Sequence, residues 1–162
     1  MGGSKIPGPI LPLPDGTLWV AASWARTTGT SDVAVIHVDG AKGELIDAVD
    51  FPTADGSEEA SALTRDARGD LWLAGSVSGL SFRGAQTKGE IDAFVFHLAP
   101  DGAFIDAWQG STPGQDFARA LAVDACGNVV VAGSTEGALV AGATPLGRSD
   151  AFVLRVPLEV RP

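Results

Sequence analysis

The sequence predicts an all-β fold in which about three copies of one four-stranded antiparallel unit follow one another. Two observations support this prediction. Residues 56–75 align without gaps on residues 114–133, which shows an internal repeat. Short runs rich in Val, Phe, Leu and Ile are bounded by Gly, Asp and Pro, a pattern typical of strands and not of helices.

The repeat extends over most of the chain. Related runs begin at Asp32 (Asp-Val-Ala-Val), Asp92 (Asp-Ala-Phe-Val) and Asp150 (Asp-Ala-Phe-Val), and residues 14–23 are a weaker copy of residues 67–76. The predicted units divide the chain as follows: residues 1–31, two inner strands of the first unit; 32–91, its outer strands and the inner strands of the second; 92–149, the outer strands of the second and the inner strands of the third; 150–162, the last strand and tail.

Each unit is expected to contain four short strands. In the best copy, with one strand from the copy before it, they cover residues 102–110, 118–124, 128–134 and 150–156. Small and large residues alternate in the second of these runs, which places Ala118, Ala120 and Ala122 on one face. A face of small side chains is expected of a strand beside a crowded central axis.

The connections between strands alternate in length. Gly adopts the positive φ that tight hairpin turns require. The predicted tight turns are Asp15-Gly16, Asp39-Gly40, Arg68-Gly69, Asp101-Gly102 and Cys126-Gly127, and the longer connections cover residues 51–59, 76–91, 111–117 and 134–149. Alternate connections of an up-and-down sheet emerge at opposite ends, so we expect a tight-turn end and a long-loop end, as in a propeller blade with a variable binding face.

These runs resemble a known repeat. The Asp-Ala-Phe-Val runs from Asp92 and Asp150, with residues 124–133, are similar to the β-propeller repeat found in tandem in large bacterial secreted and cell-surface proteins, often described as a seven-bladed-propeller repeat. The resemblance covers residues 32–156, with residues 7–31 as a decayed first half-unit. It implies propeller blades, an extracellular or cell-surface location, and no defined catalytic residues.

The chain departs from that repeat at several positions. The aromatic residue of the second strand, present as Trp19 and Trp72, becomes Val130. The Lys of the third strand is replaced by His97 or Arg155, and residues 82–84 stand near the place of a missing Phe-Pro. We therefore expect the blades to follow the repeat more closely than the loops do.

Three units are too few to close a propeller, which uses roughly four to eight blades. Three alternatives stay open: a fragment of a longer array, two copies that form a six-bladed ring, and an open stack or another all-β fold. Pro157 and Pro162 bracket the tail, so the third unit should end open, and the proline-rich residues 7–15 are expected only as an edge strand.

The composition excludes several classes of protein. The chain has 162 residues, with 11 Lys and Arg against 20 Asp and Glu, and its net charge of −9 argues against nucleic-acid binding. With 45% hydrophobic and 19% charged residues it is too apolar for intrinsic disorder, and one Cys cannot form an internal disulfide or a zinc cluster. No apolar run approaches the ~18 residues of a membrane span, and residues 1–10 lack the apolar region of a secretory signal.

Several polar residues have a structural and a chemical interpretation. Cys126 lies where the other units have turn residues, so an exposed turn residue is expected in preference to a nucleophile. His37 and His97 hold equivalent positions that become Arg155 in the third unit, which favours solvated basic residues over metal ligands or a pH switch.

Aspartates recur at strand and turn boundaries. Asp32, Asp92 and Asp150 each begin a strand, and we expect Asx-type caps that accept nearby backbone N–H groups, with calcium ligation as the alternative. Asp66 and Asp124 are expected to form turns for the same reason.

The tryptophans and the acidic pairs supply the candidate contacts. Trp19, Trp72 and Trp108 are predicted in the core, whereas Trp24 lies just beyond its strand and is the best candidate for exposed recognition. The pairs at residues 58–59 and 115–116 are predicted as a solvated acidic rim, with ligand contact or glycoside cleavage as alternatives. The candidate ligand-contacting residues are Trp24, Glu58, Glu59, Phe82, Arg83, Gln115 and Asp116.

A non-catalytic binding or scaffold module that contacts a protein or glycan is the favoured function. The loops at residues 76–91 and 134–149 share length but little sequence, which favours binding over a purely structural repeat array. A glycan hydrolase or lyase is the third alternative. We expect no catalytic residue, metal ligand or cofactor, and we expect further blades to come from the parent chain or from a homo-oligomer.

Overall fold

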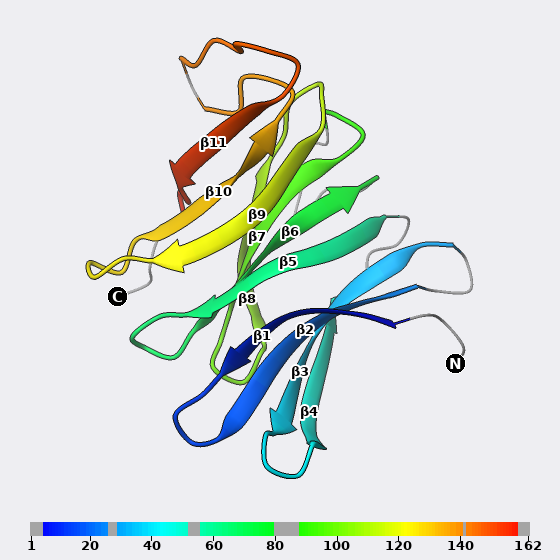
Figure 1. Ribbon diagram of the computed structural model, residues 1–162, viewed down its shortest axis with the longest axis vertical. Coiled ribbons are helices and arrows are strands. Elements are labelled where there is room, and N and C mark those ends of the chain that lie inside the picture. Colours follow the sequence, from blue (N-terminus) through cyan, green and yellow to red (C-terminus); the bar gives the residue numbers. More distant parts are fainter. Residues whose placement is uncertain (1–4, 26–28, 52–55, 80–87, 141, 159–162) are drawn as a thin grey trace.

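The described part of the chain is all-β, as predicted. The computed structural model describes residues 5–25, 29–51, 56–79, 88–140 and 142–158, which form eleven strands and no helix (Figure 1). Among these residues there is accordingly no helix with the length and apolar character that crossing a membrane demands.

The strands form three antiparallel sheets in which each strand pairs with the next along the chain. Sheet one contains β1 (Lys5–Pro12), β2 (Thr17–Ala25), β3 (Ser31–Asp39) and β4 (Glu44–Phe51). Sheet two contains β5 (Ser57–Arg65), β6 (Leu71–Ser78), β7 (Asp92–Leu98) and β8 (Phe104–Gly110). Sheet three contains β9 (Asp116–Val123), β10 (Val129–Thr135) and β11 (Asp150–Arg155).

The sheets are stacked in the order of the sequence. In Figure 1 they follow one another along the long axis, from the blue and cyan strands of sheet one to the yellow, orange and red strands of sheet three. β5 packs against β1, β2 and β3, and β9 packs against β5, β6 and β7. Sheets one and three lie at opposite ends, so the described strands close neither a barrel nor a ring, in agreement with an incomplete propeller.

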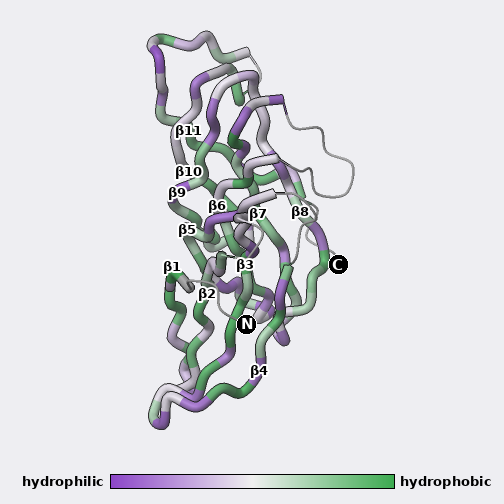
Figure 2. Tube along the Cα trace, turned by 90° about the vertical axis from the view of Figure 1, so that its right-hand side faces the viewer, coloured by the Kyte–Doolittle hydropathy of each residue, from purple (hydrophilic) through white to green (hydrophobic). Residues whose placement is uncertain are grey.

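Two hydrophobic cores hold the stack together. Trp19 of sheet one and Phe94 of sheet two belong to the first core, and Trp72 of sheet two packs with Val131 and Phe152 of sheet three in the second. The prediction that Trp19 and Trp72 are core residues is confirmed. Each large apolar side chain that is fully buried contributes about 1.5–3 kcal/mol relative to exposure. Figure 2 shows green, hydrophobic stretches along the strands of sheet one.

A β-bulge in β9 changes which residues share a face. Pairing with β10 shifts between Ala118 and Ala120, and Arg119 is the extra residue. Ala118 is buried in the second core together with the partly buried Leu121, whereas Ala120 and Ala122 are exposed. The prediction that the three alanines share one face is wrong, because one extra residue reverses the alternation of side chains.

The bulge recurs in the first strand of the other sheets. Pairing of β5 with β6 shifts between Ala60 and Ala62, and pairing of β1 with β2 shifts after Pro7. Ser61, the extra residue of β5, donates its hydroxyl to the carbonyl oxygen of Ala118 at 2.6 Å. The inner strands of sheets two and three are therefore joined at the bulge.

The tight turns lie at one end of the sheets, with one difference from prediction. The glycines of four predicted turns have positive φ, namely Gly16, Gly69, Gly102 and Gly127. In the turn between β3 and β4, however, the positive φ (71°) belongs to Gly43 and not to Gly40. This turn is longer than the predicted Asp39-Gly40 hairpin.

The predicted edge strand and the predicted open edge of the third unit are both found within the described residues. The proline-rich β1 lies at one edge of sheet one. Sheet three has three strands within the described residues. Its outer edge is therefore its third strand, β11, whereas the outer edges of sheets one and two are their fourth strands, β4 and β8.

Candidate functional site

Three junctions meet at the end of sheets two and three opposite the tight turns. They are β6–β7, β8–β9 and β10–β11. The backbone N–H of Asp116 donates to the carbonyl of Ile91 (2.8 Å), and that of Glu136 donates to the carbonyl of Gln115 (2.9 Å). These hydrogen bonds hold the three junctions together.

Two exposed carboxylates share one glutamine at this end, and we call Glu90, Gln115 and Glu136 the loop-end cluster. The side-chain amide of Gln115 donates to Glu90 Oε2, and its backbone N–H donates to Glu136 Oε2, both at 3.4 Å. Both glutamates are exposed and Gln115 is half-buried. Because these hydrogen bonds are long, the carboxylates keep most of their capacity to accept hydrogen bonds from a ligand.

The buried carboxylate of Asp116, the residue after Gln115, braces the loop-end cluster. Asp116 accepts hydrogen bonds from the Thr112 backbone N–H (2.6 Å) and the Thr112 hydroxyl (3.2 Å), and from the hydroxyl of Thr135. The Thr135 oxygen in turn accepts a hydrogen bond from the Gly137 N–H at 3.0 Å. A buried charge requires such donors, and here they tie the start of β9 to the end of β10. The prediction that Asp116 belongs to a solvated rim is therefore wrong.

Glu58 occupies the equivalent position in β5 and is also buried. Its carbonyl oxygen accepts a hydrogen bond from the Ser31 hydroxyl (3.2 Å), and the Ser31 N–H donates to Ser57 Oγ (3.1 Å). The solvated-rim prediction is wrong for Glu58 as well. Glu59 points to the other side of the strand and is exposed.

The remaining predicted contact residues are dispersed. Trp24 lies within β2, half-buried between Lys5 of β1 and Asp32 of β3, so its predicted place beyond the strand is wrong. Phe82 and Arg83 lie outside the described residues. Of the seven predicted contacts, only Gln115 belongs to the loop-end cluster.

Of the aspartates that begin strands, Asp150 accepts a nearby backbone N–H, as predicted, whereas Asp92 bonds to side chains at the end of another strand. Asp92 is buried and accepts hydrogen bonds from the Gln109 side chain (2.8 Å) and the Ser111 hydroxyl (2.9 Å). Asp150 accepts one from the Leu146 backbone N–H, which precedes it in the loop (2.8 Å). Asp92 therefore joins β7 to the end of β8, and it does not cap its own strand through these bonds.

The histidines lie at the tight-turn end, and the prediction that they are solvated is wrong for His97. His97 is 3% exposed, stacks on Trp72 with ring centroids 4.0 Å apart, and has Nε2 2.9 Å from Asp70 Oδ2. His37 is half-buried and stacks on Trp19 (4.5 Å), with Nε2 2.9 Å from the hydroxyl of Thr17. Each histidine thus covers a core tryptophan.

The ligand atoms of Asp66, Asp70 and His97 lie within 4.8 Å of one another, close enough to surround a metal ion. Each carboxylate also has a protein donor. Asp66 accepts hydrogen bonds from the backbone N–H groups of Arg68 and Asp70 and from Trp72 Nε1 (3.3 Å). These bonds explain the grouping of Asp66, Asp70 and His97 as side chains that stabilise the turn, and they confirm the prediction that Asp66 forms a turn.

The equivalent turn of sheet three perturbs an exposed acid. Hydrogen bonds from the Asn128 side chain (2.7 Å) and backbone, and from the Cys126 N–H, lower the pKa of Asp124, and the positive charge of Arg155 acts in the same direction. In the first unit, hydrogen bonds from Thr17 likewise lower the pKa of Asp15. Cys126 is exposed on the turn, as predicted.

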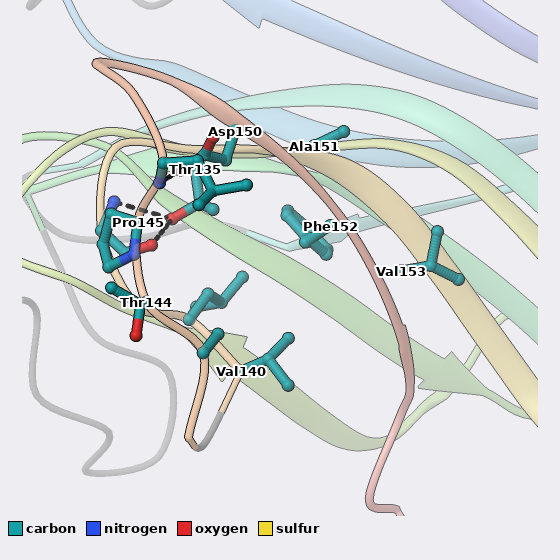
Figure 3. Close-up of a pocket in the computed structure, with 12 residues that line it drawn as sticks. Thr135, Val140, Thr144, Pro145, Asp150, Ala151, Phe152 and Val153 are labelled. Atoms are coloured by element: carbon teal, nitrogen blue, oxygen red, sulfur yellow. Dashed lines mark hydrogen bonds between the residues drawn. The ribbon is translucent and has the colours of Figure 1, made fainter.

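An open apolar pocket of about 460 Å³ lies between β11 and the β10–β11 loop (Figure 3). Val140, Pro145, Leu146 and Val153 line it, with Asp150 at one side. Leu146 is 93% exposed and Val153 is 69% exposed. Sequence reasoning missed this pocket, although the alternation in β11 places Ala151 and Val153 on the face away from sheet two.

Comparison with known proteins does not assign the chain to a family. The sequence matches no protein-family model and no curated protein.

Proposed function

We propose that the chain is a non-catalytic binding or scaffold module whose long-loop end contacts a protein or a glycan. The loop-end cluster carries this proposal. It presents two exposed carboxylates on a base formed by the buried Asp116 and its threonine donors. A rigid base keeps such groups in place before a ligand arrives, which lowers the entropic cost of binding.

The chemistry of the cluster selects a ligand that donates hydrogen bonds. Glu90 and Glu136 only accept them at neutral pH, whereas Gln115 can both donate and accept. Sugar hydroxyls or lysine and arginine side chains supply the matching donors. The net charge of −9 favours partners that are not themselves acidic.

The absence of catalysis is supported by the position of the candidate acids. Acid–base cleavage of a glycoside requires two carboxyl groups that both reach the substrate. Glu58 and Asp116 are buried, and Asp116 is engaged with Thr112 and Thr135. The acid pairs named from the sequence therefore do not offer two carboxyl groups to one substrate, and the glycan hydrolase or lyase stays the weakest alternative.

We also infer that the three sheets are blades of a bacterial β-propeller of an extracellular or cell-surface protein. The stacked antiparallel meanders, two of four strands and one of three within the described residues, and the resemblance of the runs at Asp92 and Asp150 support this inference. A structural array whose loops bind no ligand is the alternative. Variable loop sequence favours binding.

Binding of the 162-residue chain to a glycan array and to an immobilised lysine-rich peptide tests the proposal. Glu90→Gln with Glu136→Gln should weaken binding to the recognised probe at least about tenfold, since hydrogen bonds to charged groups contribute about 1.5–3 kcal/mol. Glu44→Gln with Asp101→Asn, which removes two exposed carboxylates at the tight-turn end, is the matched control. Equal losses in both double variants, or no binding to either probe, would contradict the proposal.

A further inference from the structure

The two end sheets each present an apolar face that no other described sheet covers. On sheet one this outer face alternates with the core residues of β2 and β3, and it consists of Ile10, Leu18, Val20, Ala34, Ile36 and Val38. On sheet three the outer face contains Val130, Ala132, Ala151 and Val153, with the exposed Arg155 paired beside Val130. Ala34 is fully buried, but Ile10 is 60% exposed and Val153 is 69% exposed, so each face is open to solvent at these positions.

The repeat shows what the outer face of sheet one is built to meet. The equivalent residues of sheet two are Leu63, Leu71, Leu73, Phe94, Phe96 and Leu98, and all of them pack against sheet one. Sheet three uses its equivalent face in the same way, with Val129, Val131 and Phe152 packed on sheet two. This face therefore contacts the preceding sheet wherever a preceding sheet is present.

The outer face of sheet three is the other half of the same interface. Its equivalents in sheet two are Trp72, Ala74, Ala93 and Val95, and these residues pack against sheet three. The chain thus contains this interface twice, between sheets one and two and between sheets two and three. Its ends carry the two complementary halves of a third.

We propose that a second copy of the chain supplies the missing partner, with the outer face of sheet three of each copy docked on the outer face of sheet one of the other. Such a head-to-tail contact closes only when the rotation per copy completes a turn. Two copies bring together six sheets, within the roughly four to eight of a propeller, whereas three copies would exceed that range. The expected assembly is a ring of two chains.

At two positions the proposed interface carries smaller apolar side chains than the two internal interfaces. Val130 stands where sheets one and two have Trp19 and Trp72, and Ala34 stands where sheet two has Phe94. Less apolar surface is buried at these positions, so the dimer should dissociate on dilution. Restoring the repeat residue with Val130→Trp should lower the dissociation constant about tenfold.

Sedimentation equilibrium of the 162-residue chain over a concentration series tests the proposal. The expected result is a reversible equilibrium between the 16.5 kDa chain and a species of twice that mass. A chain that stays monomeric at all concentrations would overturn the proposal, and so would a continuous series of larger species, which would mean that the contact does not close.

Two lysine variants test the pairing of the faces. Ile10→Lys and Val153→Lys each alter one outer face, and each should abolish the dimer, since every interface in the ring uses both faces. Mixing the two variants should recover association, because the unaltered sheet-three face of the first can still dock on the unaltered sheet-one face of the second. Ala67→Lys, on an exposed turn of sheet two, is the charge-matched control and should dimerise normally.

The outcome for like-with-like docking is different. If sheet one docked on sheet one, or sheet three on sheet three, only one lysine variant would lose the dimer, and the proposal would be wrong. A lysine variant that loses the dimer should still bind the recognised probe, since Glu90 and Glu136 belong to neither outer face. Failure here is thus distinguishable from failure of the proposed function.

Discussion

One turn position is filled by three different polar residues that brace the turn in related ways. Thr17 and Asp70 lie within hydrogen-bond distance of His37 and His97, and Asn128 donates to Asp124 in the unit that lacks the histidine. The residue at this position thus stabilises the turn in each unit, through a histidine in the first two units and through Asp124 in the third. The energy of the brace depends on how deeply it is buried, because water competes for exposed hydrogen bonds.

His97→Phe should destabilise the protein by about 1–3 kcal/mol, since it keeps the ring on Trp72 but removes a buried hydrogen bond to Asp70. The matched change His37→Phe should cost less, about 0.5–1.5 kcal/mol, because His37 is half-buried and its partner is an uncharged hydroxyl. Urea unfolding measures both free energies. Equal losses would show that burial and charge do not set the strength of the brace.

Asn128→Ala should raise the pKa of Asp124 toward its ordinary value, because the side-chain hydrogen bond from Asn128 is the largest cause of the lowering. A lowered pKa in the folded state stabilises the protein above the pKa of the unfolded chain, and this stabilisation is lost as the pH falls through the folded value. The variant should therefore lose less stability on acidification. Carboxyl NMR titration gives the pKa directly, and an unchanged value would refute the assignment.

The bulge in the first strand is the element that sequence reasoning missed. Strand positions and most turns follow from composition and glycine placement, but a bulge depends on how two strands pair, which hydrophobic runs do not specify. The change of phase between Ala118 and Leu121 was the available signal. The alternation of side chains along a strand also explains why one acid of the pair is buried. Glu58 lies two residues before the buried Ala60 and so shares its face toward the core, whereas Glu59 lies on the other face.

Glycine opposite the bulge should be required in sheet three. A Cβ at Gly133 would collide with the Phe117 carbonyl oxygen, so Gly133→Ala should destabilise the protein by about 1–3 kcal/mol in urea unfolding. The equivalent residue of sheet one is naturally Ala22, opposite the longer irregularity after Pro7. Ala22→Gly is the control and should cost only about 0.5–1 kcal/mol, and a larger loss there than at Gly133 would contradict the steric account.

At the scale of the whole molecule, sheet two is covered on both faces and the end sheets on one. The sequence predicted this order of units, but not which acidic side chains would be exposed at the loop end. Glu90 and Glu136 are brought together by hydrogen bonds between loops that are distant in sequence, and neither has a distinguishing motif. Only Gln115 of the cluster was therefore predicted.

Amide hydrogen exchange should be slowest in β6 and β7, whose residues are almost all buried, and faster in β1, β4 and β11 at the sheet edges. Exchange of a sample dilute enough to be monomeric, followed by mass spectrometry of peptides or by NMR, measures this order. Uniform protection across the three sheets would show instead that the molecule opens only as a single unit.

The nearest-neighbour packing of the sheets has a consequence for how such a chain can change length. Because each meander is completed by consecutive residues and docks on the one before it, a duplication of one unit in the coding sequence would insert a further sheet without rewriting the contacts of the others. Growth or loss of whole units is then an easier evolutionary step than growth within one, and loop sequences are free to diverge after each copying event.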